Sequence, residues 1–204
     1  MIFGRHGHYD CAFFVLRKYY QRVRDRTIDI KIYYRMAYLC NSTHQSHKMK
    51  KKKTIAIVAH DNRKRDMIEW VSWNWKELCP HSLVCTGTTG KLVEEALVKK
   101  CEENDVIPPH ITRLKSGPLG GDQQLGAMIC EENIDMLIFF WDPMQPQPHD
   151  VDVKALLRIS TLYNIPTATN RSTADFIISS KLFAQEYTPI LKDYSNYIKR
   201  EVDI

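Results

Sequence analysis

Long apolar runs are missing from this sequence of 204 residues, and their absence excludes several kinds of protein. No run is longer than the six residues of Met136–Trp141, whereas a membrane-spanning helix needs about 20. The apolar stretch 11–16 is too short for the core of a secretory signal, and Arg17 and Lys18 follow it directly. We therefore expect neither a membrane-spanning helix nor a secretory signal.

Closely spaced cysteine pairs are also missing. The sequence has no C-x-x-C pair and no dense cysteine framework of the kind found in small secreted domains. The six cysteines are Cys11, Cys40, Cys79, Cys85, Cys101 and Cys130. This spacing predicts free, buried thiols in a protein of the reducing cytoplasm.

Positive charge is concentrated in the first quarter of the chain. Residues 1–48 hold nine basic and three acidic side chains, a net charge of +6, and residues 49–204 hold 20 basic and 21 acidic ones, a net charge of −1. The sum is the overall +5, and the pI is about 8.8. A nearly neutral main domain argues against nucleic acid as a partner, and we expect no membrane partner either.

The basic segment divides the chain into residues 1–53, an extension without a sustained helical or alternating period, and residues 54–204, a globular domain. The extension is open to three interpretations. It is a basic arm for nucleic acid or anionic membrane, a transit-like extension, or an upstream stretch that is not translated. We favour the third, because Met49 can start a chain and only four lysines separate it from the first predicted strand.

Strands and helices alternate along residues 54–204. Short β-branched and apolar runs predict strands, and apolar residues at helical spacing predict helices. The predicted strands are 54–59, 82–86, 110–115, 135–141 and 167–169, and the predicted helices are 65–78, 91–101, 122–132, 151–163 and 172–180. Ser172 and Asp175 have the spacing of an N-terminal cap. The alternation predicts a three-layer α/β/α sandwich with a mainly parallel sheet.

Ligands of such sheets bind at the carboxyl ends of the strands, so the residues that follow each strand are the candidates. His60 and Lys64 follow the first strand, and a Lys beside a helix N-terminus attracts anions; taken alone, a solvated first turn is the simpler explanation of these two residues. The second strand is followed by Thr86–Gly90 (TGTTG), which matches neither common nucleotide-binding fingerprint. Its glycines and hydroxyls suit a phosphate, and an ordinary strand-to-helix turn is the alternative.

Two carboxylate candidates follow the third and fourth strands. Asp122 comes after Ser116, Gly117 and three further glycine or proline residues, and is either the N-cap of a helix or a base held against a substrate carbon. Beyond the fourth strand come Asp142 and then the sequence His149-Asp150-Val151-Asp152, in which a carboxylate can orient an imidazole. Suitable groups at four strand ends together favour a functional site.

These segments resemble the methylglyoxal synthases. The matching stretches are VAHD with Lys64, TGTTG, SGPLGGDQQ (116–124), LIFFWDP (137–143), PHDVDVKALLR (148–158) and ATNRSTADFIISS (168–180). The resemblance covers nearly all of residues 54–197. It implies a carbon–oxygen lyase that converts dihydroxyacetone phosphate into methylglyoxal and inorganic phosphate, a bypass of glycolysis, in a cytoplasmic homohexamer without metal or organic cofactor.

The resemblance also assigns the residues. It implies Asp122 as the catalytic carboxylate and His149 as a catalytic, substrate-binding histidine. The remaining substrate-binding positions are His60, Lys64, Thr86, Gly87, Thr88, Thr89, Ser116 and Gly117. We expect Asp142 and Asp152 to support these groups from behind, and inorganic phosphate to be both product and inhibitor.

Two segments depart from the family pattern. Residues 91–115 are longer than in compact members, and we expect the excess to form a helix and a surface loop away from the site. A family arginine near the C-terminus does not align cleanly, and Arg200 is left unassigned. The main alternative function is a non-catalytic, regulatory module of the same fold that binds anionic metabolites.

Overall fold

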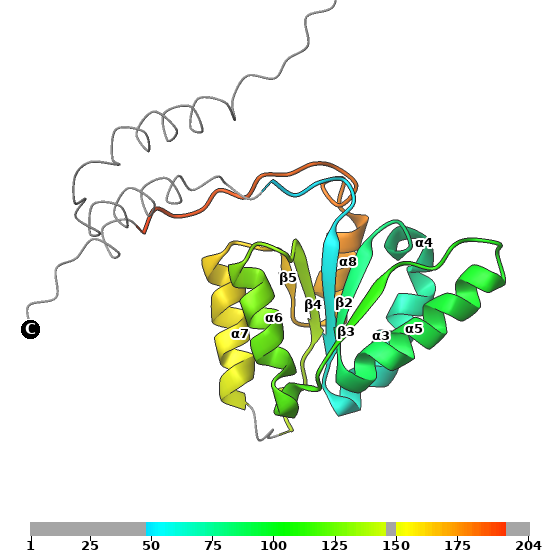
Figure 1. Cartoon of the computed structure of the whole chain (residues 1–204), viewed down its shortest axis with the longest axis horizontal. Helices are drawn as coiled ribbons and strands as arrows, with labels where there is room; N and C mark the ends of the chain where they lie inside the picture. Colours follow the sequence, from blue (N-terminus) through cyan, green and yellow to red (C-terminus); the bar gives the residue numbers. More distant parts are fainter. Residues whose placement is uncertain (1–47, 146–149, 195–204) are drawn as a thin grey trace, which may run out of the picture. The chain divides into compact units, whose positions relative to one another are not determined.

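The computed structural model describes residues 48–145 and 150–194, all of which lie in one unit that begins at Ser46 (Figure 1). The strands are β1 (Thr54–Ala59), β2 (Ser82–Thr86), β3 (Ile111–Leu114), β4 (Met136–Phe140) and β5 (Thr167–Ala168). The α-helices are α3 (Lys64–Trp73), α4 (Trp75–Leu78), α5 (Gly87–Glu102), α6 (Gly121–Cys130), α7 (Asp150–Leu162) and α8 (Arg171–Ser179). Two 3₁₀ turns, η1 (Asp61–Arg63) and η2 (Gly117–Leu119), precede α3 and α6.

The five strands form one parallel sheet in the order β3-β2-β1-β4-β5. The chain first builds outward from β1 through β2 to β3 and then returns to place β4 on the other side of β1. The strand order therefore reverses at β1. In an open parallel sheet, this reversal leaves a crevice beyond the carboxyl ends of the central strands, where ligands bind.

Helices cover both faces of the sheet, as Figure 1 shows, with α3, α5 and α8 on one side and α6 and α7 on the other. Each side has its own apolar core. Ile55 and Ile57 of β1 pack with the first group of helices, and Ala56 and Val58 pack with the second. Burial on both faces explains why β1 and β4 read as continuous apolar runs. The expected three-layer sandwich is confirmed.

Three helix ends differ from the sequence-based expectation. The helix expected over 65–78 breaks at Asn74 into α3 and α4. Helix α5 begins at Gly87 rather than at residue 91. The N-cap of α8 is Asn170, whose side-chain oxygen accepts a hydrogen bond from the Thr173 N–H (2.9 Å). The cap predicted at Ser172 is therefore wrong.

The lysine-rich stretch before β1 is packed against the domain. Met49 is fully buried, and its backbone exchanges two hydrogen bonds with Tyr187 (2.8 and 3.1 Å). Lys53 is also fully buried, with Nζ donating to the carbonyl oxygens of Lys50 (2.9 Å) and Gln185 (2.7 Å). Burial lowers the pKa of Lys53 below its usual range. Residues 49–53 thus pack with the segment that follows α8.

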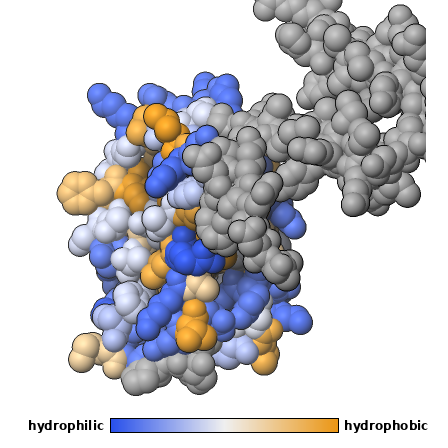
Figure 2. Space-filling view, turned by 90° about the vertical axis from the view of Figure 1, so that its left-hand side faces the viewer, coloured by the Kyte–Doolittle hydropathy of each residue, from blue (hydrophilic) through white to orange (hydrophobic). Residues whose placement is uncertain are grey.

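The surface on the side of α7 carries its apolar side chains as separate spots between hydrophilic residues, in the coloured part of Figure 2. Within residues 48–145 and 150–194, no helix is long and apolar enough to cross a membrane. The residues predicted as a basic extension, up to position 47, lie outside the described structure.

Candidate functional site

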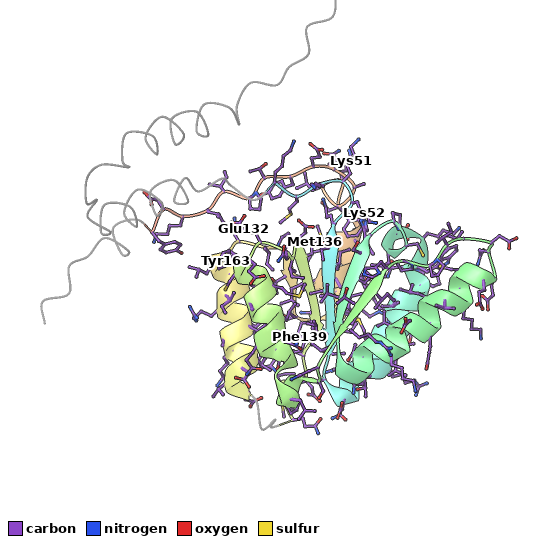
Figure 3. All side chains as sticks on the ribbon, viewed as in Figure 1. Lys51, Lys52, Glu132, Met136, Phe139 and Tyr163 are labelled. Atoms are coloured by element: carbon purple, nitrogen blue, oxygen red, sulfur yellow. The ribbon has the colours of Figure 1, made fainter. Side chains whose placement is uncertain are left out.

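A pocket of about 310 Å³ lies at the edge of the sheet where β1, β2 and β3 end. Its lining comprises Val58, Ala59, His60, Asp61, Lys64, Thr86, Gly87, Thr88, Thr89, Ser116, Gly117, Pro118, Asp122 and Phe139. Figure 3 labels two residues of β4 and shows Phe139 toward this edge and Met136 toward the opposite one. The pocket thus occupies the position that the strand order favours for a ligand.

The first turn of α5 forms one wall of the pocket. Thr86 is the N-cap, and Gly87 begins the helix with φ +39°. A Cβ on Gly87 would lie 2.7 Å from Cα of Ser116, and the Gly87 N–H donates to the Lys115 carbonyl (3.1 Å). Only glycine fits this close approach. The contact brings the loops after β2 and β3 together, with the N-terminus of a 16-residue helix facing the pocket.

The two threonines of this turn have different partners. The Thr88 hydroxyl accepts a hydrogen bond from Nζ of Lys64. The Thr89 hydroxyl donates to the carbonyl oxygen of Ala59 at the end of β1 (3.3 Å), and Thr89 is only 2% exposed. The hydroxyl group of Thr89 therefore holds the wall of the pocket in place. The group of Thr89 that suits an anion is its backbone N–H, which lies in the first turn of the helix.

Lys64 brings a full positive charge to the pocket. It is the first residue of α3, and its Nζ lies 2.5 Å from Oδ1 of Asp61 as well as against Thr88. The Lys64 side chain is 22% exposed, whereas that of Asp61 is 80% exposed. The ion pair holds the ammonium group between β1 and α5. Its charge adds to the positive end of the α5 dipole, and the two together favour an anion such as phosphate.

Asp122 supplies a buried carboxylate in the first turn of α6. It is 5% exposed, and the N-cap of α6 is Gly120 (φ +94°), so Asp122 is not the N-cap. The neighbouring Gly121 lies so close to the β3 loop that a Cβ would be 2.1 Å from the Lys115 carbonyl oxygen. This close packing fixes the start of α6 and, with it, the position of the Asp122 side chain.

His60 follows β1 directly and is held from two sides. Its Nδ1 accepts a hydrogen bond from the backbone N–H of Asp142 (3.3 Å), and its ring contacts Phe139 edge to face (5.1 Å between centroids). An imidazole that accepts at Nδ1 carries its proton on Nε2 when neutral. His60 is 6% exposed, and the residue lines the pocket.

Hydrogen bonds join the loop after β4 to the loop after β1. Asn62 donates from Nδ2 to Oδ2 of Asp142 (3.1 Å), and the backbone N–H of Met144 donates to Oδ1 (3.1 Å). These bonds, the Asn62 one first, hold the pKa of Asp142 below its usual range. Asp142 therefore supports His60 from behind through its backbone.

Most of the residues predicted from the sequence come together in this pocket. His60, Lys64, Asp122, the four residues 86–89 and residues 116–117 all line it. Asp142 lies behind His60, and Asp152 lies half-buried in the first turn of α7, away from the lining. His149 and Arg200 lie outside the described residues.

Several residues of the site were not assigned from the sequence. Asp61 directly follows His60 in the VAHD stretch, so its position was visible, although its pairing with Lys64 was not. Phe139 was recognised as part of a buried strand and not as part of the pocket floor. Asn62 gave no signal at all, because its role depends on the distance between two loops.

The arrangement suits an acid–base reaction on a small anionic substrate. It combines a buried carboxylate, an imidazole donor, and a cationic wall within one pocket. Among the residues that the structure describes, no cluster of three or more His, Cys, Asp and Glu side chains is arranged to hold a metal ion. The side chains of the described pocket can supply general-base chemistry and anion binding.

Comparison with known proteins connects this chain to one family. A sequence model of the MGS-like domain matches residues 66–169. The chain is similar to the methylglyoxal synthase of Maridesulfovibrio salexigens, with 58% identity over 158 residues that cover 76% of this chain and all of that protein. It is 54% identical to the methylglyoxal synthase of Oleidesulfovibrio alaskensis over 74% of this chain and 97% of that protein.

A solved structure is similar as well. The crystal structure of methylglyoxal synthase from Elizabethkingia anophelis matches with a TM-score of 0.66 and 47% sequence identity, over 76% of this chain and 96% of that one.

Proposed function

This chain belongs to the methylglyoxal synthase family, and we propose that it converts dihydroxyacetone phosphate into methylglyoxal and inorganic phosphate. The comparisons confirm the family resemblance that the sequence motifs indicated. One observation carries the reaction proposed for the pocket: a buried carboxylate, that of Asp122, lies in the same pocket as the cationic wall formed by Lys64 and the N-terminus of α5.

Asp122 acts as the general base. It removes a proton from the hydroxymethyl carbon next to the ketone, and the electron pair left behind forms an enediolate. A positioned base of this kind contributes about 10²–10⁴-fold to a rate. Its low exposure and its fixed place at the start of α6 support this role, because a base must be held within hydrogen-bond reach of the carbon-bound proton.

The phosphate group binds at Lys64 and the first turn of α5. When the enediolate collapses, the bond between carbon and the bridging oxygen breaks and inorganic phosphate leaves with the electron pair. Negative charge on the phosphate oxygens grows in this step. A cation and a helix N-terminus next to those oxygens stabilise the charge, and so favour elimination over reprotonation of the enediolate.

Histidines stabilise the enediolate oxygens. His60 lines the pocket and carries its proton on Nε2, since its Nδ1 accepts from the backbone N–H of Asp142. His149 is assigned the second donor role on the sequence resemblance. Donors aimed at developing charge contribute about 10²–10³-fold each.

The decisive experiment measures methylglyoxal directly. The full chain is incubated with dihydroxyacetone phosphate, and methylglyoxal is assayed by colour. We expect turnover by the wild type, loss of at least about 10²-fold for Asp122→Asn with phosphate binding retained, and normal turnover for Asp66→Asn. Asp66 is the matched control because it also lies in the first turn of a helix but forms only an exposed ion pair with Arg63 (3.2 Å).

Two outcomes would redirect the assignment. Near-normal turnover of Asp122→Asn removes Asp122 from the base role. Binding of phosphate and dihydroxyacetone phosphate by the wild type, without any methylglyoxal, replaces the enzyme with the alternative of a regulatory, anion-binding module.

The remaining features are proposals from the family resemblance. The protein is a cytoplasmic homohexamer, so light scattering should give a mass near six times 23.9 kDa. It needs neither a metal nor an organic cofactor and has no nucleic-acid or membrane partner. Inorganic phosphate binds the same cationic wall and inhibits, so kinetics that are unchanged across millimolar phosphate count against that wall as the phosphate site.

A further inference from the structure

Two cysteines lie in contact at the end of α5 that is remote from the pocket. Cys79 directly follows α4, and Cys101 lies in the last turn of α5. Their Sγ atoms are 3.1 Å apart. A disulfide bond has sulfurs about 2.0 Å apart, so a shift of about 1 Å would close it. Two thiols that packing already holds at this distance need little rearrangement to form a bond.

Only one of the two thiols is open to solvent. Cys101 is fully buried, whereas Cys79 is partly exposed and lines a wide, shallow opening of about 560 Å³. The other residues of this opening are Trp75, Lys76, Pro80, Val106 and Ile107. A small oxidant therefore reaches Cys79 first, and Cys101 stands directly behind it.

The loop from residue 103 to residue 110 builds one side of this opening. It exposes Val106 (41%) and Ile107 (86%). This loop follows α5 at the end opposite to the Gly87 turn, so it lies away from the pocket. Its apolar side chains border the entry to Cys79.

We propose that Cys79 and Cys101 form a redox modification site, a dithiol that closes reversibly to a disulfide. With hydrogen peroxide as oxidant, the Cys79 thiolate attacks one peroxide oxygen, the O–O bond breaks, and hydroxide leaves. The sulfenic acid on Cys79 is then attacked by the Cys101 thiolate, which forms the S–S bond and releases a second hydroxide. Together with the two thiol protons, the products are one disulfide and two waters. A small thiol reverses the closure by exchange.

The surroundings of the pair make the closure slow. Burial, and then the hydrogen bond with Cys101, raise the pKa of the Cys79 thiol to about 12. Little thiolate is therefore present at neutral pH, and the thiolate is the form that reacts. The pair stays reduced in a reducing compartment, and it responds to a sustained supply of oxidant rather than to a brief one.

Closure would tie together the two ends of a segment that contains the pocket wall. Residues 79–101 include β2 and almost all of α5, with Gly87 and the threonine turn inside the closed loop. A cross-link over a loop of this length stabilises the folded state mainly by restricting the unfolded chain. We expect the melting temperature to rise by about 5–10 °C on oxidation.

The test uses the full chain, because all six cysteines must compete. The protein is treated with hydrogen peroxide or with oxidised glutathione, and the cross-link is located by peptide mass. We expect a mass lower by two hydrogens, a Cys79–Cys101 peptide, and a higher melting temperature that dithiothreitol reverses. Cys130→Ser, which changes an exposed cysteine, should behave like the wild type, whereas Cys79→Ser should show none of these changes.

Several results would overturn the proposal. One is a cross-link that joins other cysteines. Another is sulfinic acid that accumulates on Cys79 without a disulfide. A third is that Cys79 and Cys101 are still free thiols when the exposed Cys130 has already been oxidised. Because Cys101 is buried, Cys101→Ser is paired with Cys101→Ala, and melting of both reduced variants separates a folding defect from loss of the cross-link.

Discussion

His81 makes the stability of this fold depend on pH. The side chain is 6% exposed, its Nδ1 accepts a hydrogen bond from the Lys53 backbone N–H (3.1 Å), and its ring contacts Phe183 edge to face (4.9 Å). A proton cannot be added at Nδ1 without breaking that bond. Burial, and then the positive charge of Lys53, lower the pKa of His81 from 6.5 to about 4.

The magnitude follows from this difference in pKa. Above pH 6.5 His81 is neutral in both states and contributes no pH dependence. Below pH 6.5 His81 binds a proton in the unfolded chain but stays neutral in the folded one. The free energy of unfolding therefore falls as the pH falls, and this loss is complete near pH 4. Each pKa unit corresponds to about 1.4 kcal/mol, so the whole loss is at most about 3 kcal/mol.

Urea unfolding in a series of buffers between pH 7.5 and pH 4 measures this loss of stability. Carboxylates also titrate in this range, so the wild type is compared with His81→Asn, which keeps an acceptor near Nδ1 but does not titrate. The stability of the wild type relative to this variant should fall by up to about 3 kcal/mol. His110→Asn, at an exposed histidine, should show no such change. Parallel curves for wild type and His81→Asn would refute the reasoning.

Three further predictions concern the pocket and the thiols. Gly87→Ala should lower the free energy of unfolding, measured with urea, by about 1–3 kcal/mol, because φ of Gly87 is +39° and an added Cβ would lie 2.7 Å from backbone. The control Gly126→Ala, whose Cβ would have its nearest contact at 3.6 Å, should stabilise the fold slightly. Lys64→Gln should lower kcat/KM for dihydroxyacetone phosphate about 10–100-fold in steady-state kinetics, and an unchanged value would remove Lys64 from phosphate binding. Iodoacetamide should label Cys130 before Cys79 at pH 7, and the rate at Cys79 should still be rising steeply at pH 9, since its pKa is about 12; equal rates at pH 7 would contradict this.

Much of the fold follows from the sequence because its three central strands, β1, β2 and β4, are largely buried. The bounds of β1 and β2 were predicted to the residue, since each is a short β-branched run between polar turns. The order of the strands was not predicted, because it depends on pairings between segments far apart in the chain. The start of α5 was missed for a related reason. Gly87 is a poor helix former, and it begins the helix because it fits against the loop of Lys115.

The candidate site was predictable in its composition and not in its contacts. Polar residues after parallel strands must gather at one edge, which is enough to bring His60, Lys64 and Asp122 together. Which hydroxyl faces a ligand is a matter of rotamers and neighbours. Thr89 appeared equivalent to Thr88 in the sequence, yet it is bonded to the end of β1.

The two helix N-termini explain how one pocket can hold two negative groups. A carboxylate base and a substrate phosphate repel each other, and an isolated buried Asp122 would weaken phosphate binding. The repulsion is offset separately for each group. Asp122 lies in the first turn of α6, whose N-terminus attracts it, whereas the proposed phosphate position faces the first turn of α5 and the ammonium group of Lys64. Proton abstraction neutralises Asp122, so the repulsion is relieved in the step that forms the enediolate, before the phosphate leaves.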